Sequence, residues 1–122
     1  MAKVMVVDDA HSELRLMESM LAAGGHQVLT YADGHLVEDA LLAEQPDVVL
    51  LDIVMPGRNG YEVLRALKRD ARTRATPVVI VSSKSQQSDR LWGQRQGADG
   101  YLAKPFTAEQ LLATVARAVG RP

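Results

Sequence analysis

Short apolar runs alternate with longer amphipathic segments along the whole chain. Residues 3–7, 47–51 and 77–81 are largely apolar and rich in β-branched side chains, a pattern typical of strands that are covered on both faces of a sheet. Residues 26–31 and 99–103 are less uniformly apolar and predict strands nearer the edges of that sheet. We therefore expect a sheet of five strands.

The segments between these runs carry apolar residues at spacings of three and four, which predict helices with one buried face. The members of these faces are Leu14, Met17 and Leu21; Val37, Ala40 and Leu41; Tyr61, Leu64 and Leu67; and Leu112, Val115 and Val119. A fourth helix, over residues 86–96, is strongly polar, and Leu91 is its main candidate for an inward anchor. Gly93 in its interior is expected to cost about 1 kcal/mol relative to alanine.

Signals at the ends of these segments agree with the periodicity. Gly24-Gly25 is a helix stop, while Asn59 with Glu62 and Thr107 with Gln110 have the spacing of capping boxes at helix starts. Strands that alternate with helices require right-handed crossovers and a parallel sheet. The predicted fold is a doubly wound α/β sandwich, with five parallel strands in a flavodoxin-like (βα)5 arrangement.

Composition narrows the class of protein. The chain has 122 residues, enough for one domain over residues 1–122, and its 14 basic and 15 acidic side chains give a net charge of −1. Such a balance does not attract nucleic acid or an anionic membrane surface. The absence of cysteine excludes thiol catalysis and thiolate metal sites. No apolar stretch is long enough to span a membrane and no signal-peptide pattern opens the chain, so we expect a cytoplasmic protein.

Chemically distinctive residues follow the predicted strands. Asp8 and Asp9 follow the first strand, Asp52 the third, Ser82 the fourth and Lys104 the fifth. Ligands of such sheets bind at the carboxyl ends of the strands, so these side chains are expected to meet at one rim. Three neighbouring carboxylates repel one another and imply either a cation between them or raised pKa values. A set of oxygen donors without Cys or His makes Mg²⁺ the natural occupant.

The predicted rim fits phosphoryl transfer, in which positioning and charge neutralisation dominate. Lys104 supplies a positive charge and Ser82 a hydroxyl for an anion beside the metal. We take Asp52 as the nucleophile because it ends the most apolar strand and because aspartyl phosphates form when a carboxylate is activated in this way. The Pro56-Gly57 and Asn59-Gly60 turns behind it keep the loop clear for a donor.

Four motifs, VVDDA at 6–10, LLDIVMPGRNG at 50–60, VSS at 81–83 and GYLAKPF at 100–106, resemble those of two-component response regulator receiver domains of the CheY-like single-domain kind. The resemblance covers essentially the whole chain and implies one receiver domain with no output domain. It implies that Asp52 is the phosphoacceptor, Asp9 a direct Mg²⁺ ligand, Asp8 a ligand mostly through water and the Val54 backbone carbonyl a further ligand. It implies that Ser82 and Lys104 contact the phosphoryl oxygens, that Tyr101 changes rotamer on activation, and that Lys104-Pro105 is cis.

A narrower likeness lies in residues 84–98, which are similar to PilH-type regulators of type IV pilus twitching motility. The chain departs from the chemotaxis pattern at Val54, where CheY has Asn, and at Lys84, where CheY has an acidic residue. Both positions flank the path of water to the acyl phosphate, so the lifetime of that group does not carry over from the resemblance.

The main alternative is a haloacid-dehalogenase-like phosphatase, which also forms an aspartyl phosphate but requires a second Asp at the position of Val54. A second alternative is a receiver-shaped scaffold that is never phosphorylated, which the intact acidic set argues against. The receiver interpretation implies a histidine kinase or phosphotransfer protein as donor and a downstream protein target. It implies no catalytic activity beyond the protein's own phosphorylation and dephosphorylation. We expect a monomer or a weak dimer.

A single domain has to signal through its own surface. We place the partner-binding face on the fourth helix, the fifth strand and the fifth helix, with Arg90, Arg95 and Tyr101 as contacts and Trp92 at the margin. The polar fourth helix has few inward anchors and is therefore expected to shift easily when Ser82 moves toward a phosphoryl group and Tyr101 turns inward.

Overall fold

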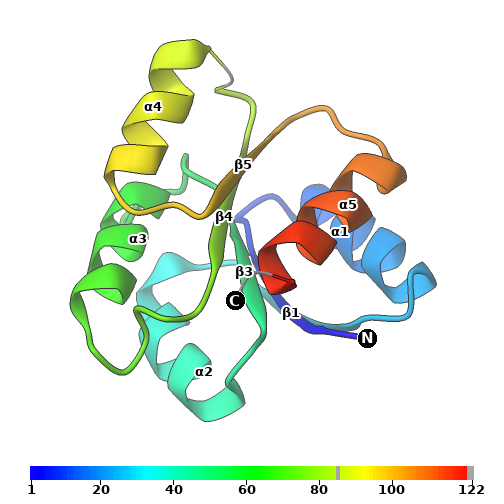
Figure 1. Cartoon of the computed structure of the whole chain (residues 1–122), viewed down its shortest axis with the longest axis horizontal. Helices are drawn as coiled ribbons and strands as arrows, with labels where there is room; N and C mark the ends of the chain where they lie inside the picture. Colours follow the sequence, from blue (N-terminus) through cyan, green and yellow to red (C-terminus); the bar gives the residue numbers. More distant parts are fainter. Residues whose placement is uncertain (85, 121–122) are drawn as a thin grey trace.

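The computed structural model describes residues 1–84 and 86–120 and consists of one parallel sheet between two layers of helices (Figure 1). The strand order is β2-β1-β3-β4-β5, and every pair of neighbours is parallel. The elements are β1 Lys3–Val7, α1 His11–Ala23, β2 Gln27–Tyr31, the 3-10 helix η1 Gly34–Leu36, α2 Val37–Glu44, β3 Val48–Leu51, α3 Gly60–Arg69, β4 Val78–Ser82, α4 Gln87–Arg95, β5 Gly100–Ala103 and α5 Ala108–Val119. The predicted fold class is confirmed, and the two less apolar strands lie at the edges.

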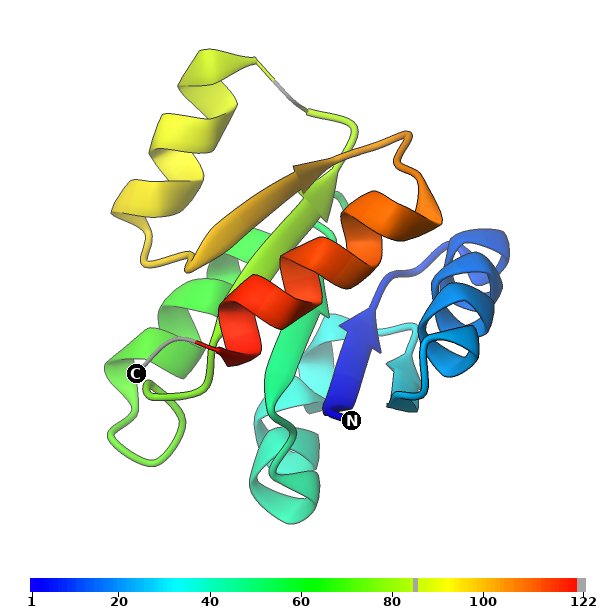
Figure 2. The ribbon, with the colours of Figure 1, turned by 45° about the vertical axis from the view of Figure 1, so that its right-hand side comes forward.

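Alternate residues of the buried strands feed two separate cores. Val4 and Val6 of β1 pack with Leu50 under α1 and α5, whereas Met5 and Val7 pack on the opposite face with the residues under α2 and α3. Figure 2 shows α5 crossing one face of the sheet, with α3 and α4 behind it. Because both faces are covered, the central strands need no polar alternation.

Two of the predicted helix faces differ from those observed. In α5 the buried residues are Leu111, Thr114, Val115 and Ala118, while Val119 is exposed. In α4 Leu91 is 46% exposed, so its expected role as an inward anchor is wrong, and the buried residue is Gly93. The side of α4 that faces the sheet lies too close to it for a large side chain: a Cβ on Gly93 would meet Ile80 Cδ1 at 2.8 Å.

Helix starts are capped as the spacing predicts. The side chains of Asn59 and Thr107 accept hydrogen bonds from the N–H groups of Glu62 and Gln110 in reciprocal capping boxes. None of the helices in the described ranges has the length and apolar content needed to cross a membrane.

Candidate functional site

Three carboxylates meet where β1 and β3 end. The strands pair in register with Val7 opposite Leu51, so the residues that follow, Asp8 and Asp52, are neighbours across the sheet. Asp8 is 1% exposed and Asp52 is 9% exposed, while Asp9 is half-buried. One carboxylate oxygen from each of the three residues lies within 4.8 Å of the others.

Lys104 reaches the same point from the loop after β5. Its Nζ donates a hydrogen bond of 2.8 Å to Asp8 Oδ2 and lies 3.7 Å from Asp52 Oδ1. The Lys104-Pro105 bond is cis, as predicted. The structure thus brings together an ammonium group and three carboxylates that come from strands far apart in the sequence.

The three carboxylates differ in what they already bind. Asp8 uses both oxygens, because the Ala10 N–H donates to Oδ1 at 3.0 Å and Lys104 donates to Oδ2. Within the described ranges, no hydrogen bond or ion pair engages the side chain of Asp9. Asp9 and Asp52 therefore have the oxygen atoms that are most available to a ligand.

Asp52 has the most perturbed carboxyl group of the cluster. Burial, together with the negative charge of Asp8, raises the pKa of Asp52 from 3.8 to about 6, although Lys104 partly offsets this effect. Burial disfavours the charge on Lys104, but the hydrogen bond to Asp8 and the charge of Asp52 outweigh it and raise the pKa of Lys104. The raised pKa of Asp52 shows that its negative charge is disfavoured beside Asp8, a repulsion that a bound cation would relieve.

The donor set fits a hard divalent cation. Among the described residues, the cluster offers three carboxylates and so only oxygen ligands, and Mg²⁺ takes one or two carboxylates while it keeps several waters. Val54, whose carbonyl is an expected ligand, is 58% exposed in the β3–α3 loop, and no hydrogen bond within the described part of the chain uses that carbonyl.

The chain bends sharply behind Asp52. Gly60 donates its N–H to the Ile53 carbonyl at 2.8 Å, and a Cβ on Gly60 would lie 2.1 Å from the Asp52 carbonyl oxygen. Only glycine allows this approach, so the Asn59-Gly60 turn fixes how the loop returns past Asp52.

The hydroxyl at the end of β4 is connected to the loop that follows it. Ser82 is buried, and its Oγ accepts a hydrogen bond of 3.1 Å from the Lys84 N–H. The Tyr101 hydroxyl donates to the Lys84 carbonyl. Burial raises the pKa of the Tyr101 phenol. Tyr101 is thus attached to the β4–α4 loop.

A pocket of about 430 Å³ opens over the cluster on the side of α1. Leu16, Pro105 and Phe106 add apolar surface to its wall, and Glu13 adds a carboxylate. The sequence did not predict that these four residues lie beside the cluster. Their approach depends on the packing of α1 beside the β5–α5 loop, which no local motif encodes.

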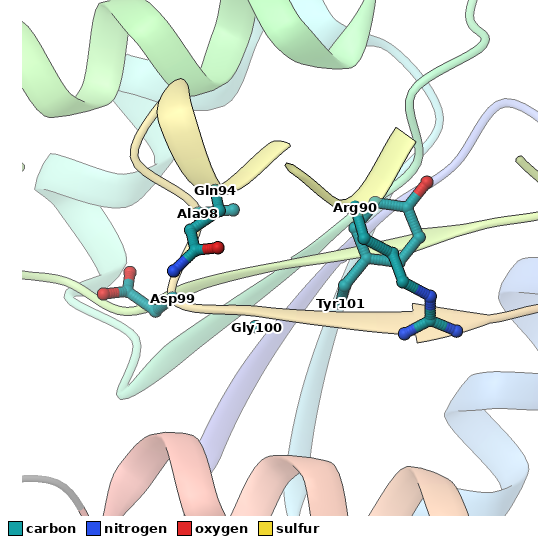
Figure 3. A pocket seen from close by; sticks show the side chains of 6 residues that line it. All are labelled: Arg90, Gln94, Ala98, Asp99, Gly100 and Tyr101. Carbon is teal, nitrogen blue, oxygen red and sulfur yellow. The ribbon is translucent and has the colours of Figure 1, made fainter. Parts of the chain in front are cut away.

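Of the four residues expected on the partner surface, Arg90 and Tyr101 lie together. Arg90 Cζ lies 5.3 Å from the centre of the Tyr101 ring. Both residues line a pocket between α4 and β5 (Figure 3). The other residues of its lining are Gln94, Ala98, Asp99 and Gly100. Trp92 instead packs edge-on against Tyr61 of α3, with ring centres 6.3 Å apart. Arg95 is exposed in the last turn of α4 and, like Trp92, does not line this pocket within the described ranges.

Known proteins resemble this chain over nearly its full length. The model of the response regulator receiver domain family matches residues 4–116. Protein PilH of Pseudomonas aeruginosa is 48% identical over 94% of this chain and 95% of its own length. Response regulator PleD of Caulobacter vibrioides is 39% identical over 93% of this chain, which corresponds to 25% of PleD. The structure of the chemotaxis protein CheY4 of Vibrio cholerae superimposes with a TM-score of 0.89 and 32% identity, covering 97% of this chain and 98% of that one.

Proposed function

The chain belongs to the response regulator receiver family, and from this premise we propose that it accepts a phosphoryl group on Asp52 from a phosphohistidine, in the presence of Mg²⁺. The observation that carries the proposal is the contact set at the end of β3: Asp52 lies between two further carboxylates and the ammonium group of Lys104. The donor is a histidine kinase or a phosphotransfer protein.

The phosphoryl transfer uses an oxygen of Asp52 as the nucleophile and an imidazole nitrogen of the donor as the leaving group. An oxygen of the Asp52 carboxylate attacks the phosphorus, the phosphorus–nitrogen bond of the donor breaks, and its electron pair returns to the imidazole nitrogen. The carboxylate must be ionised to attack, and the pKa of about 6 leaves it mostly ionised at pH 7.5. A bound Mg²⁺ neutralises the charge that gathers on the phosphoryl oxygens.

The hydrogen bonds that each oxygen of the cluster already accepts indicate which residues would bind the metal and which would contact the phosphoryl group. Asp9, Asp52 and the Val54 carbonyl would hold the metal, because their oxygens are the ones left available to it. Asp8 already accepts two hydrogen bonds and would act on the metal through water, as the family resemblance implies. Lys104 can exchange its contact with Asp8 for one with a phosphoryl oxygen, and the Ser82 hydroxyl supplies a second contact.

The apolar wall of the pocket beside Asp52 gives the donor a place to dock. Leu16 is 46% exposed, and it lines the pocket together with Phe106 and Pro105. An imidazole ring that presents phosphorus to Asp52 from this side would rest against apolar surface. We assign the kinase or phosphotransfer contact to this wall.

The output surface is assigned to α4, β5 and α5, centred on Arg90 and Tyr101. Tyr101 joins this surface to Ser82 through the Lys84 carbonyl, so a shift of Ser82 toward a phosphoryl group moves the loop that positions Tyr101. The 48% identity to PilH supports a place in the control of type IV pilus twitching motility, through contact with a protein target.

Intact-mass spectrometry with acetyl phosphate or phosphoramidate tests the proposal. We expect one phosphoryl group per chain with Mg²⁺ and none with EDTA, and we expect Asp52→Asn to abolish labelling. Asp39→Asn is the matched control, because Asp39 is an exposed carboxylate of α2. Equal labelling of the Asp52→Asn variant would refute the proposal. Continuous turnover of p-nitrophenyl phosphate would favour the phosphatase alternative, and a complete lack of labelling would favour the scaffold.

A further inference from the structure

The β3–α3 loop, residues 52–59, is tied to the segment that precedes α2 by one side chain. The guanidinium of Arg58 donates to the Gly34 carbonyl at 3.1 Å. It also makes a two-point contact with Glu38: NH2 lies 2.7 Å from Oε2, and NH1 donates to Oε1. We call Arg58, Glu38 and the Gly34 carbonyl the Arg58 latch. Both charged side chains are partly buried, at 19% and 32% exposure.

Close packing surrounds the latch. Gly34 is buried, and a Cβ there would lie 3.0 Å from the Arg58 carbonyl oxygen and 3.3 Å from Met55 Cε. Gly57 has a φ of +78°, and a Cβ on it would meet the His35 ring at 2.8 Å. The loop and the η1 segment are therefore in close contact, through the backbone between Gly34 and Arg58 and through the side chains of Met55 and His35.

The latched loop also carries Val54, the expected source of a carbonyl ligand for Mg²⁺. At its start, the loop is joined to β1 by the hydrogen bond from the Asp52 N–H to the Val7 carbonyl. The other backbone hydrogen bonds of residues 53–58 are short-range, from the Gly60 N–H to the Ile53 carbonyl and from the Arg58 N–H to the Pro56 carbonyl. Among residues 53–58, Arg58 is the one whose side chain makes a polar contact beyond the loop in the described part of the chain. The latch is thus the polar side-chain contact that holds residues 53–58, beyond Asp52, against the body of the protein.

We propose that Arg58 and Glu38 are positioning residues for the metal site, because the Arg58 latch holds the β3–α3 loop where the Val54 carbonyl can complete the coordination of Mg²⁺ beside Asp9 and Asp52. This inference rests on the proposed function. Neither residue touches the metal or the phosphoryl group. Outer partners that hold metal ligands in place affect metal affinity by about tenfold or more when they are removed, so the latch is expected to act at that scale.

Magnesium titration by isothermal calorimetry, run beside acetyl phosphate labelling, tests the inference. Arg58→Ala and Glu38→Gln should each raise the Mg²⁺ Kd by about tenfold. Labelling of Asp52 should slow at low Mg²⁺ and recover at saturating Mg²⁺. The double variant should be no worse than the more affected single variant, because the two residues act through the same contact.

The matched control is Arg72→Ala, which removes a guanidinium–carboxylate pair with Asp70 in the loop after α3. It should leave the Mg²⁺ Kd unchanged, and urea unfolding should verify that all variants are folded. Unchanged Kd values for Arg58→Ala and Glu38→Gln in folded protein would overturn the inference, as would strictly additive effects in the double variant. If wild type binds Mg²⁺ but is not labelled, the proposed function fails, while the latch is still judged on the Kd values alone.

Discussion

Asp52 has a carboxyl group whose surroundings oppose its ionisation. In the folded protein its pKa is raised to about 6 by burial and by the charge of Asp8, whereas an unfolded aspartate titrates at 3.8. The folded state therefore holds its proton to higher pH than the unfolded state does. The stability that this group contributes is complete below about pH 4 and is lost as the pH rises through 6.

This linkage predicts how Asp52→Asn changes stability. Without metal at pH 7.5, the variant should be more stable than wild type by roughly 3 kcal/mol at most, because the asparagine carries no charge to bury. The difference should shrink toward zero near pH 4, and saturating Mg²⁺ should narrow it at pH 7.5. Urea unfolding from pH 4 to 8 in EDTA measures it. If the difference in the free energy of unfolding between the variant and wild type did not depend on pH, the charge of Asp52 would not be its cause.

The residues of the rim could be predicted from the sequence because parallel strands place their carboxyl ends at one edge. Asp8, Asp52 and Lys104 each follow a readable apolar run. The partners of each oxygen could not be predicted in this way. The hydrogen bond between Lys104 and Asp8 joins residues 96 positions apart and depends on how the β5–α5 loop lies over β1.

Among the elements, α4 departs most from its sequence pattern. Propensity treats Gly93 as a weak point of the helix, yet Gly93 is the residue that meets the sheet, with Ile80 and the Tyr101 ring directly opposite. Leu91 and Trp92 lie on its exposed sides. Tertiary packing overrides propensity here, because close approach to β4 and β5 requires the absence of a side chain.

Gly93→Val should therefore destabilise the protein by about 2 kcal/mol, since it forces side chains into filled space. It should also displace the Tyr101 ring, because the two methyl groups of valine extend beyond a Cβ that would already be in van der Waals contact with two ring carbons at 3.4 Å. Urea unfolding and the NMR shifts of Tyr101 measure these effects. Gln94→Val, at the next position and exposed, is the control and should cost only the small difference in helix propensity. Equal losses for the two variants would mean that Gly93 has no packing role.

Across the whole molecule, one chain of contacts joins the site to the surface. It runs from Ser82 through the backbone of Lys84 to the Tyr101 hydroxyl, and from the Tyr101 ring to Arg90 of α4. The pattern of apolar runs sufficed to predict the sheet, its edges and the two layers of helices. It did not predict this chain of contacts, because the attachment of Tyr101 to a backbone carbonyl leaves no trace in spacing.

Amide hydrogen exchange with and without beryllofluoride and Mg²⁺ tests whether that chain transmits a signal. We expect changed protection in residues 52–60 and also in residues 86–104, because the loop held by Tyr101 leads into α4. Residues 18–23, the part of α1 beyond the pocket-lining residues Glu13 and Leu16, provide the internal reference. Changes confined to residues 8–10 and 52–60 would rule out the proposed output surface.

The central claim, that Asp52 forms an acyl phosphate, is tested most directly by chemical trapping. Borohydride reduces the carbonyl of an aspartyl phosphate to an alcohol, which leaves homoserine at that position. The protein is phosphorylated with phosphoramidate and Mg²⁺, reduced, digested and mapped by peptide mass spectrometry. We predict homoserine at position 52 that disappears when EDTA replaces Mg²⁺. Homoserine at another aspartate, or an unmodified position 52 in a sample that carries the added phosphoryl mass, would contradict the account.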